Sequence, residues 1–303
     1  MFYPPPARHA RFRRSRILIV GCGDVGLRAA RLLPHCRVLA LTSQAERAPA
    51  LRSAGLVPLV GNLDRAADLS RLAGLAQRVL HLAPPPSQGA TDGRTAALLH
   101  ALARRGGLRS LVYGSTTGVY GDAAGACFDE TRAVAPATDR ARRRVDAEAR
   151  VRWWGRRQVH RHGTHATILR IPGIYALNRE GGDPRERVRK GSPLLRPEDD
   201  VYTNHIHADD LARACVLALW RARPGRVLHA CDDTDLRMGD YFDWVADHFG
   251  LPRPPRISRD EAQRALSPMQ MSFMSESRRL LNQRLKAELR LRLRYPTIEH
   301  GLA

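Results

Sequence analysis

Residues 16–26 read Arg-Ile-Leu-Ile-Val-Gly-Cys-Gly-Asp-Val-Gly, an apolar run typical of a strand followed by a G-x-G-x-x-G turn, and residues 27–33 have a helix-like pattern. A strand, this turn and a helix form the context in which a dinucleotide binds, because the helix N-terminus offers unpaired N–H groups and a positive dipole end to a pyrophosphate. Gly21 permits the tight turn, Gly23 lets the backbone approach the pyrophosphate, and Gly26 lets the helix pack on the strand. The candidate cofactor-binding residues are Gly21, Cys22, Gly23, Asp24, Val25 and Gly26.

The end of the next strand indicates which dinucleotide is preferred. Turns that bind NAD usually place a carboxylate on the ribose about 20 residues after the first glycine. This chain has Thr42 and Ser43 there, with Arg28 and Arg47 flanking the place of a 2′-phosphate. A guanidinium suits a phosphate, so we expect NADP, with NAD as the alternative. The other interpretation is that both arginines are solvated surface residues.

Apolar runs then alternate with helix-length stretches along the chain. This alternation predicts an α/β protein with a Rossmann-type, doubly wound parallel sheet. The run at 110–116 ends in Ser115 and Thr116, and the ligand crevice of such a sheet lies at the carboxyl ends of its strands. The predicted strands include residues 16–20, 37–41, 56–60, 78–83 and 226–231.

Composition limits the classes of partner. The 303 residues carry a formal net charge of +20, but Lys190 and Lys286 are the only lysines and the arginines are spread over every segment. We interpret this as a compositional bias and expect no specific nucleic acid. Five cysteines without C-x-x-C spacing predict neither a disulfide framework nor a zinc knuckle, and indicate a reduced, cytoplasmic setting. No apolar run approaches the length of a membrane span, so we expect no membrane partner.

Two groups of side chains resemble metal ligands on paper. His160, His162 and His165 straddle a turn, and residues 205–210 contain two histidines and two aspartates. A solvated turn explains the first group. A helix start, where an aspartate caps unpaired N–H groups, explains the second. We therefore expect no metal.

The run Gly-Ser-Thr-Thr-Gly-Val-Tyr-Gly at 114–121 resembles a signature of the extended short-chain dehydrogenase/reductases (SDRs), the group that contains nucleotide-sugar epimerases and dehydratases. Residues 169–175 and 206–212 resemble two later motifs of that family in the same order. The prolines at 84–86 and the C-terminal residues 282–296 resemble its atypical, YeeZ-like branch. The resemblance implies a catalytic hydroxyl at Thr116. It adds these candidate cofactor-binding residues: Asn62, Leu63, Leu82, Ala83, Pro84, Ser115 and Pro172.

The chain departs from this family at the acid/base. Catalytically active members of the family carry the motif Y-x-x-x-K. Counting back from Glu148 places Arg144 at the lysine position and Arg140 at the tyrosine position. A guanidinium stays protonated and only donates hydrogen bonds, so neither arginine replaces the phenol. An enzyme would need another donor, with Tyr120 and Tyr175 as candidates, or would use Arg140 to stabilise a developing anion. The alternative is a non-catalytic protein whose NADP occupancy reports redox state to a partner.

The resemblance also implies the organisation of the chain. We expect a flexible basic leader at 1–14, a cofactor-binding domain at 15–175, and a mainly substrate-binding lobe at 176–303. The sheet of the cofactor-binding domain is expected to be completed by a strand within 201–232. The expected substrate is a small molecule, anionic or sugar-like, acted on by an oxidoreductase or an epimerase/dehydratase-type enzyme. A homodimer is the expected assembly.

Overall fold

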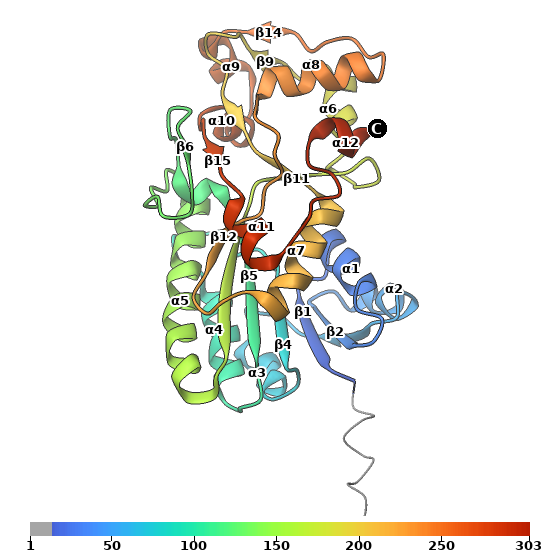
Figure 1. Ribbon diagram of the computed structural model, residues 1–303, viewed down its shortest axis with the longest axis vertical. Helices are drawn as coiled ribbons and strands as arrows, with labels where there is room; N and C mark the ends of the chain where they lie inside the picture. The colour runs from blue at the N-terminus through green and yellow to red at the C-terminus, as the bar shows by residue number, and fades with distance from the viewer. Residues whose placement is uncertain (1–13) are drawn as a thin grey trace, which may run out of the picture.

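The computed structural model describes residues 14–303, so the predicted leader, apart from Arg14, lies outside the described residues. Its largest element is a seven-stranded sheet in the order β12-β7-β5-β4-β1-β2-β3 (Figure 1). All six strand pairs are parallel. The predicted Rossmann-type sheet is confirmed. Its strands are β1 (Arg16–Val20), β2 (Arg37–Thr42), β3 (Val57–Val60), β4 (Arg78–His81), β5 (Ser110–Thr116), β7 (His165–Ile171) and β12 (Val227–His229).

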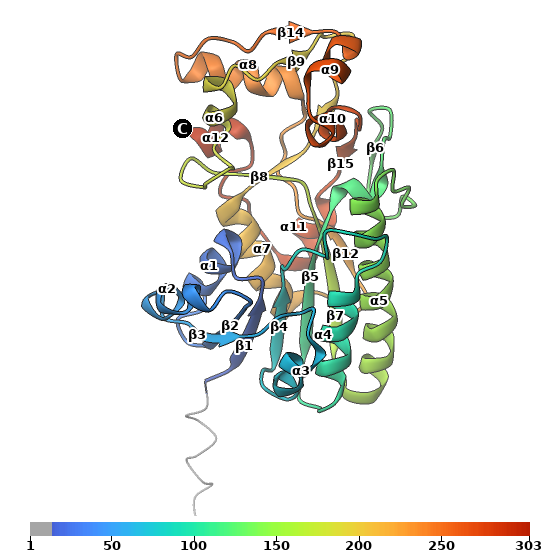
Figure 2. The ribbon, with the colours of Figure 1, turned by 180° about the vertical axis from the view of Figure 1, so that it is seen from behind.

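Helices cover both faces of the sheet because alternate strand residues point to opposite sides. In β1, Ile17 and Ile19 pack with one group of helices, while Leu18 and Val20 pack with the other. The first layer holds α1 (Asp24–Arg31), α7 (Ala208–Arg221) and α11 (Gln283–Leu289), with α2 (Ala48–Ser53) at its edge. The second layer, seen in Figure 2, holds α3 (Ala66–Leu69), α4 (Gly93–Ala103) and α5 (Asp139–His162). Short 3₁₀ turns are η2 (Ala45–Arg47), η3 (Ser70–Leu72) and η4 (Thr117–Tyr120).

A smaller lobe lies above the carboxyl ends of the strands (Figure 1). Its core includes Tyr241 and Val245 from one helix and Leu194 and Leu195 from a short strand. Its helices are α6 (Pro184–Arg189), α8 (Met238–His248), α9 (Arg259–Ala265), α10 (Pro268–Met274) and α12 (Ile298–Leu302). Its strands and those joining it to the sheet are β6 (Cys127–Phe128), β8 (Gly173–Tyr175), β9 (Leu194–Leu195), β10 (Tyr202–Thr203), β11 (His205–His207), β13 (Leu236–Arg237), β14 (Arg256–Ile257) and β15 (Arg279–Leu280). No helix within 14–303 is long and apolar enough to cross a membrane.

Candidate active site

The three glycines of the first turn have three different environments. Gly21 has φ +83°, and a Cβ there would lie 2.3 Å from the backbone nitrogen of Ala83. A Cβ on Gly26 would lie 3.2 Å from the Ile19 side chain, which shows how closely α1 packs on β1. A Cβ on Gly23 would meet nothing within 4 Å. The turn is therefore closed toward the protein and open where a pyrophosphate would approach, so these residues fit a dinucleotide.

The other predicted cofactor residues lie along the same edge of the sheet as this turn. Leu82 and Ala83 both donate backbone hydrogen bonds to the Val20 carbonyl, which brings the end of β4 beside the end of β1. The Thr42 carbonyl accepts from the nitrogen of Gly61, next to Asn62, so β2 and β3 end together. Pro84 follows Ala83 at this edge, and Ser43, Leu63, Ser115 and Pro172 come from the strand ends or the residues next to them.

The two arginines expected at the 2′-phosphate have different roles in the structure. Arg28 is buried, and its guanidinium pairs with Asp24, Asp209 and Asn178 at 2.6–3.1 Å. These contacts join α1 to α7 and leave no nitrogen free, so its expected role as a phosphate ligand is corrected to a structural one. Arg47 instead donates to the carbonyl of Cys22 at 2.9 Å, which places its guanidinium on the glycine turn.

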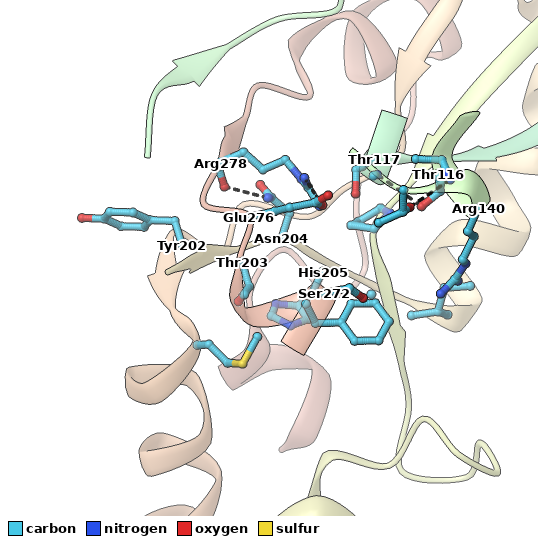
Figure 3. A pocket seen from close by; sticks show the side chains of 18 of the residues that line it. Thr116, Thr117, Arg140, Tyr202, Thr203, Asn204, His205, Ser272, Glu276 and Arg278 are labelled. Carbon is cyan, nitrogen blue, oxygen red and sulfur yellow. Dashed lines mark hydrogen bonds and ion pairs between the residues drawn. The ribbon is translucent and has the colours of Figure 1, made fainter. Parts of the chain in front are cut away.

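A cavity of about 570 Å³ lies between the strand ends and the small lobe (Figure 3). Two predicted catalytic residues line it: Thr116 at the end of β5, and Arg140 in the first turn of α5. Thr116 Oγ1 is 3.4 Å from the Gly118 nitrogen, a weak contact that leaves the hydroxyl able to bond a ligand. The Arg140 guanidinium carbon lies 5.9 Å from the centre of the Phe273 ring.

Arg144, one turn further along α5, does not line this cavity within the described chain. Its Nη1 donates to the Gly114 carbonyl at 2.8 Å and to the Tyr113 hydroxyl at 3.0 Å. The guanidinium is thus held against the end of β5. In the sheet, β4 separates β5 from β1, the strand that leads into the glycine turn.

The two tyrosines proposed as proton donors are corrected. Tyr120 is 1% exposed and Tyr175 is 3% exposed, and neither lines the cavity. The 3₁₀ turn η4 presents Thr117 and Gly118 to the cavity and directs Tyr120 into the core. The Tyr175 hydroxyl occupies the space beside Gly301, where a Cβ would lie 2.3 Å from it. Burial raises the pKa of both phenols, which further opposes acid catalysis.

Tyr120 belongs to a buried network beneath the cavity. The His229 Nδ1 lies 3.0 Å from the Leu281 carbonyl, which only accepts, so Nδ1 carries the proton and Nε2 accepts from the Tyr120 hydroxyl at 2.5 Å. Arg170 donates to the same hydroxyl at 2.5 Å and binds both oxygens of Glu148 at 3.0 and 2.6 Å. The Tyr120 hydroxyl therefore donates its proton in a hydrogen bond to His229.

The small lobe supplies cavity residues that the sequence analysis missed. Glu276 and Arg278 form an ion pair of 2.6 Å, and Arg179 lies 3.2 Å from Asp24 of the glycine turn. Arg187 of α6 and His205 of β11 complete this group, and burial lowers the pKa of His205 to about 4. No local motif marks the four charged positions, and His205 was singled out only as a resemblance to a metal ligand. They reach the cavity through the fold of the second lobe.

The histidines have structural environments. His205 stacks on Tyr241 with ring centroids 4.0 Å apart. His207 caps α7, because its Nδ1 accepts from the Asp209 nitrogen at 3.2 Å. The expected cap was an aspartate, so the capping residue is corrected. Across residues 14–303, no group of three or more His, Cys, Asp or Glu side chains is arranged to hold a metal ion.

Comparison with known proteins identifies the family. Residues 17–231 match the model of the NAD dependent epimerase/dehydratase family. The chain belongs to this family. A conserved protein of Silicibacter pomeroyi, described as functionally unknown, has a structure 30% identical in sequence, with a TM-score of 0.78 over 95% of this chain and 96% of that one. No curated protein matches.

More distant members of the epimerase/dehydratase group share the fold. The UDP-glucose 4-epimerase of Thermotoga maritima, solved with UDP-glucose, is 17% identical with a TM-score of 0.76, covering 95% of this chain and 96% of its own. The dTDP-glucose 4,6-dehydratase of Streptomyces venezuelae, solved with NAD, is 21% identical with a TM-score of 0.74, covering 95% and 94%. The family expected from the motifs is confirmed. Membership of the YeeZ-like branch stays a prediction.

Proposed function

We propose that this member of the epimerase/dehydratase family is an NADP-dependent oxidoreductase or epimerase/dehydratase-type enzyme that acts on a small anionic, sugar-like molecule. The observation that carries the proposal is the cavity itself. It places Thr116 at the carboxyl end of β5 and surrounds it with Arg140, Arg179, Arg187 and Arg278, against one lining carboxylate among the described residues, Glu276. An excess of guanidinium groups favours a negatively charged substrate.

The proposed chemistry assigns a different task to each side chain. When bound, the dinucleotide supplies a hydride acceptor or donor. The Thr116 hydroxyl bonds a substrate oxygen and orients it. Arg140 stabilises negative charge on that oxygen but takes no proton, because a guanidinium stays charged. Because Arg140 replaces the tyrosine of the family motif, another side chain must accept the proton.

Glu276 is positioned to accept that proton. The point where a Cβ on Gly118 would stand is 3.8 Å from Thr116 Oγ1 and 4.0 Å from Glu276 Oε2. The carboxylate and the hydroxyl therefore flank one small open space, which exists because residue 118 is a glycine. Figure 3 shows Glu276 and Thr116 on the same side of the cavity. The same carboxylate forms an ion pair with Arg278 at 2.6 Å, which holds it at this wall of the cavity.

The preference for NADP rests on Arg47 and on the residues after β2. Arg47 reaches the glycine turn. Thr42, the last residue of β2, and Ser43 occupy the place of the carboxylate that NAD-binding turns usually have, and such a carboxylate would repel a 2′-phosphate. Because Arg28 is paired with Asp209 of α7, only Arg47 of the two predicted arginines supports binding of a 2′-phosphate.

A non-catalytic, NADP-sensing protein is the second candidate function. It is favoured by the lack of a suitable phenol within the part of the cavity that the structure describes. Tyr202 lines the cavity, but its ring packs between Arg237 and Arg279, and its hydroxyl points away from Thr116 (Figure 3).

Calorimetric titration with NADP and NAD, followed by cofactor absorbance and chromatographic analysis of products with a panel of nucleotide sugars and sugar acids, tests the proposal. We expect tighter binding of NADP than NAD at low salt and turnover of at least one anionic substrate. Gly23→Asp abolishes cofactor binding through steric and charge conflict, whereas Gly106→Asp, at an exposed glycine beyond α4, leaves it unchanged. Binding of NADP without any turnover selects the sensing function. Equal or tighter binding of NAD refutes the 2′-phosphate assignment.

A further inference from the structure

Arg187 is a half-buried cation, and none of the described residues gives it a carboxylate partner. Its Nε and Nη2 are buried and make no hydrogen bond. Burial alone lowers its pKa, since no acidic group lies close enough in residues 14–303 to raise it. Its guanidinium lies 4.9 Å over the ring of Phe242 in α8. This contact fixes the position of the charge but does not neutralise it.

Its neighbours show how unusual this arrangement is. Arg185, two residues earlier in α6, pairs with Asp183 at 2.7 Å. Arg278 and Arg179, which also line the cavity, have Glu276 and Asp24 as partners. An unpaired charge that is removed from water destabilises a fold, so proteins seldom keep one without a reason. Arg187 lines the cavity, so a ligand there can approach its side chain.

We propose that Arg187 binds an oxyanion of the substrate, a phosphoryl or carboxylate group, on the wall of the cavity formed by the small lobe. This proposal rests on the proposed function and narrows its substrate class. The reacting part of the substrate lies at Thr116 and Arg140, so the oxyanion is a second group that Arg187 recognises from α6. A guanidinium held on an aromatic ring presents a positive charge in a fixed position to such a group.

The unpaired charge has a thermodynamic consequence. Without a ligand, Arg187 carries an uncompensated desolvation cost, and an oxyanion in the cavity removes it. A neutral side chain of similar length at this position should leave the unliganded protein at least as stable as the parent. Affinity for oxyanions should fall at the same time. A purely structural arginine would show the opposite result, with stability lost and binding retained.

The test uses the full chain, with inorganic pyrophosphate as the phosphoryl probe and malonate as the carboxylate probe. Binding is measured by calorimetry and stability by thermal unfolding in an anion-poor buffer. Arg187→Met is expected to weaken binding of the recognised probe by about tenfold or more, while its unliganded midpoint is equal to or above that of the parent. The matched control is Arg189→Met, an exposed position on the same helix, which should behave like the parent in both measurements.

The outcomes separate the alternatives. The probe that binds the parent more tightly identifies the oxyanion as phosphoryl or carboxylate. If Arg187→Met does not fold, Arg187→Lys decides, because it keeps the charge and loses the planar guanidinium. Binding of neither probe to the parent, or unchanged binding in the Arg187 variants, overturns the proposal. NADP titration of the parent and of Arg187→Met is run in parallel, so a failure of the cofactor assignment is recognised separately.

Discussion

Arg170 and Arg187 are 17 positions apart and have opposite environments. Arg170 is 1% exposed, and its guanidinium bonds Glu148 and Tyr120. Arg187 lines the cavity, and its Nε and Nη2 are buried without a hydrogen-bond partner among residues 14–303. In a chain with this much arginine, position alone does not separate structural from functional residues. The difference in pairing does, because a satisfied guanidinium contributes to the core and an unsatisfied one is available to a ligand.

The same contrast separates two neighbours on β5. The Ser115 hydroxyl donates to Glu148 at 2.7 Å and so joins the Arg170 network, whereas Thr116 lines the cavity. Successive residues of a strand point to opposite faces, so adjacent hydroxyls have different tasks. Three predictions test this division between network and cavity.

The largest effect is expected from breaking the network. Glu148→Gln removes the charge that balances Arg170, so the free energy of unfolding should fall by about 3–5 kcal/mol. Chemical denaturation measures it. As a control, Glu186→Gln changes a carboxylate that makes no ion pair within the described chain and should cost less than about 0.5 kcal/mol. A Glu148→Gln variant as stable as its parent would mean that the Arg170 pairs contribute little.

Thr116→Val should act on turnover rather than on folding. It keeps the shape and deletes one oriented hydroxyl, so turnover should fall by about 10 to 1000-fold, with cofactor affinity nearly unchanged. Steady-state kinetics on the substrate found in the panel provide the measurement. Ser115→Ala should lower stability instead. Parental turnover in Thr116→Val would assign the hydroxyl a structural role.

The smallest effect concerns pH. Burial lowers the pKa of His229 to about 4, below its ordinary value of 6.5. The unfolded chain therefore binds a proton before the folded protein does, and stability present above pH 6.5 is lost as pH falls toward 4. Between pH 7 and pH 5, His229 should account for about 2 kcal/mol of this loss. Thermal unfolding of the parent and His229→Gln over this range should show a shallower decline in the variant, and identical slopes would contradict the proton assignment.

The fold was predictable from local signals. The apolar strands, the glycine turn and the hydroxyls at the end of β5 each act within a few residues, and the structure has β1, α1 and β5 at those positions. The sheet and the family followed from them. The predicted strand ends differed slightly from those of the structure. Residues 226–231 were predicted as a strand, but β12 has three residues because the chain leaves the sheet after His229.

The site was only partly predictable. Thr116 and Arg140 lie in the cavity because a strand end and a helix start fix their positions. The prediction of Tyr120 as a proton donor was wrong because the 3₁₀ turn η4 directs its side chain into the core. The prediction of Arg28 as a phosphate ligand was wrong because Arg28 pairs with Asp209, which is 181 residues away in the sequence. Glu276 and Arg187 had no sequence signal. Their contribution depends on tertiary packing of the second lobe.

Asp24 links the two halves of the molecule. It belongs to the glycine turn, and its carboxylate pairs with Arg28 and also with Arg179, which lines the cavity. An anion in the cavity and the carboxylate of the turn therefore compete for one guanidinium. By thermodynamic reciprocity, any change that the first ligand makes in the affinity for the second is returned in equal measure. The coupling between the two sites thus depends on a single shared carboxylate, and it can be measured before any substrate is known by titrating the cofactor with and without an oxyanion.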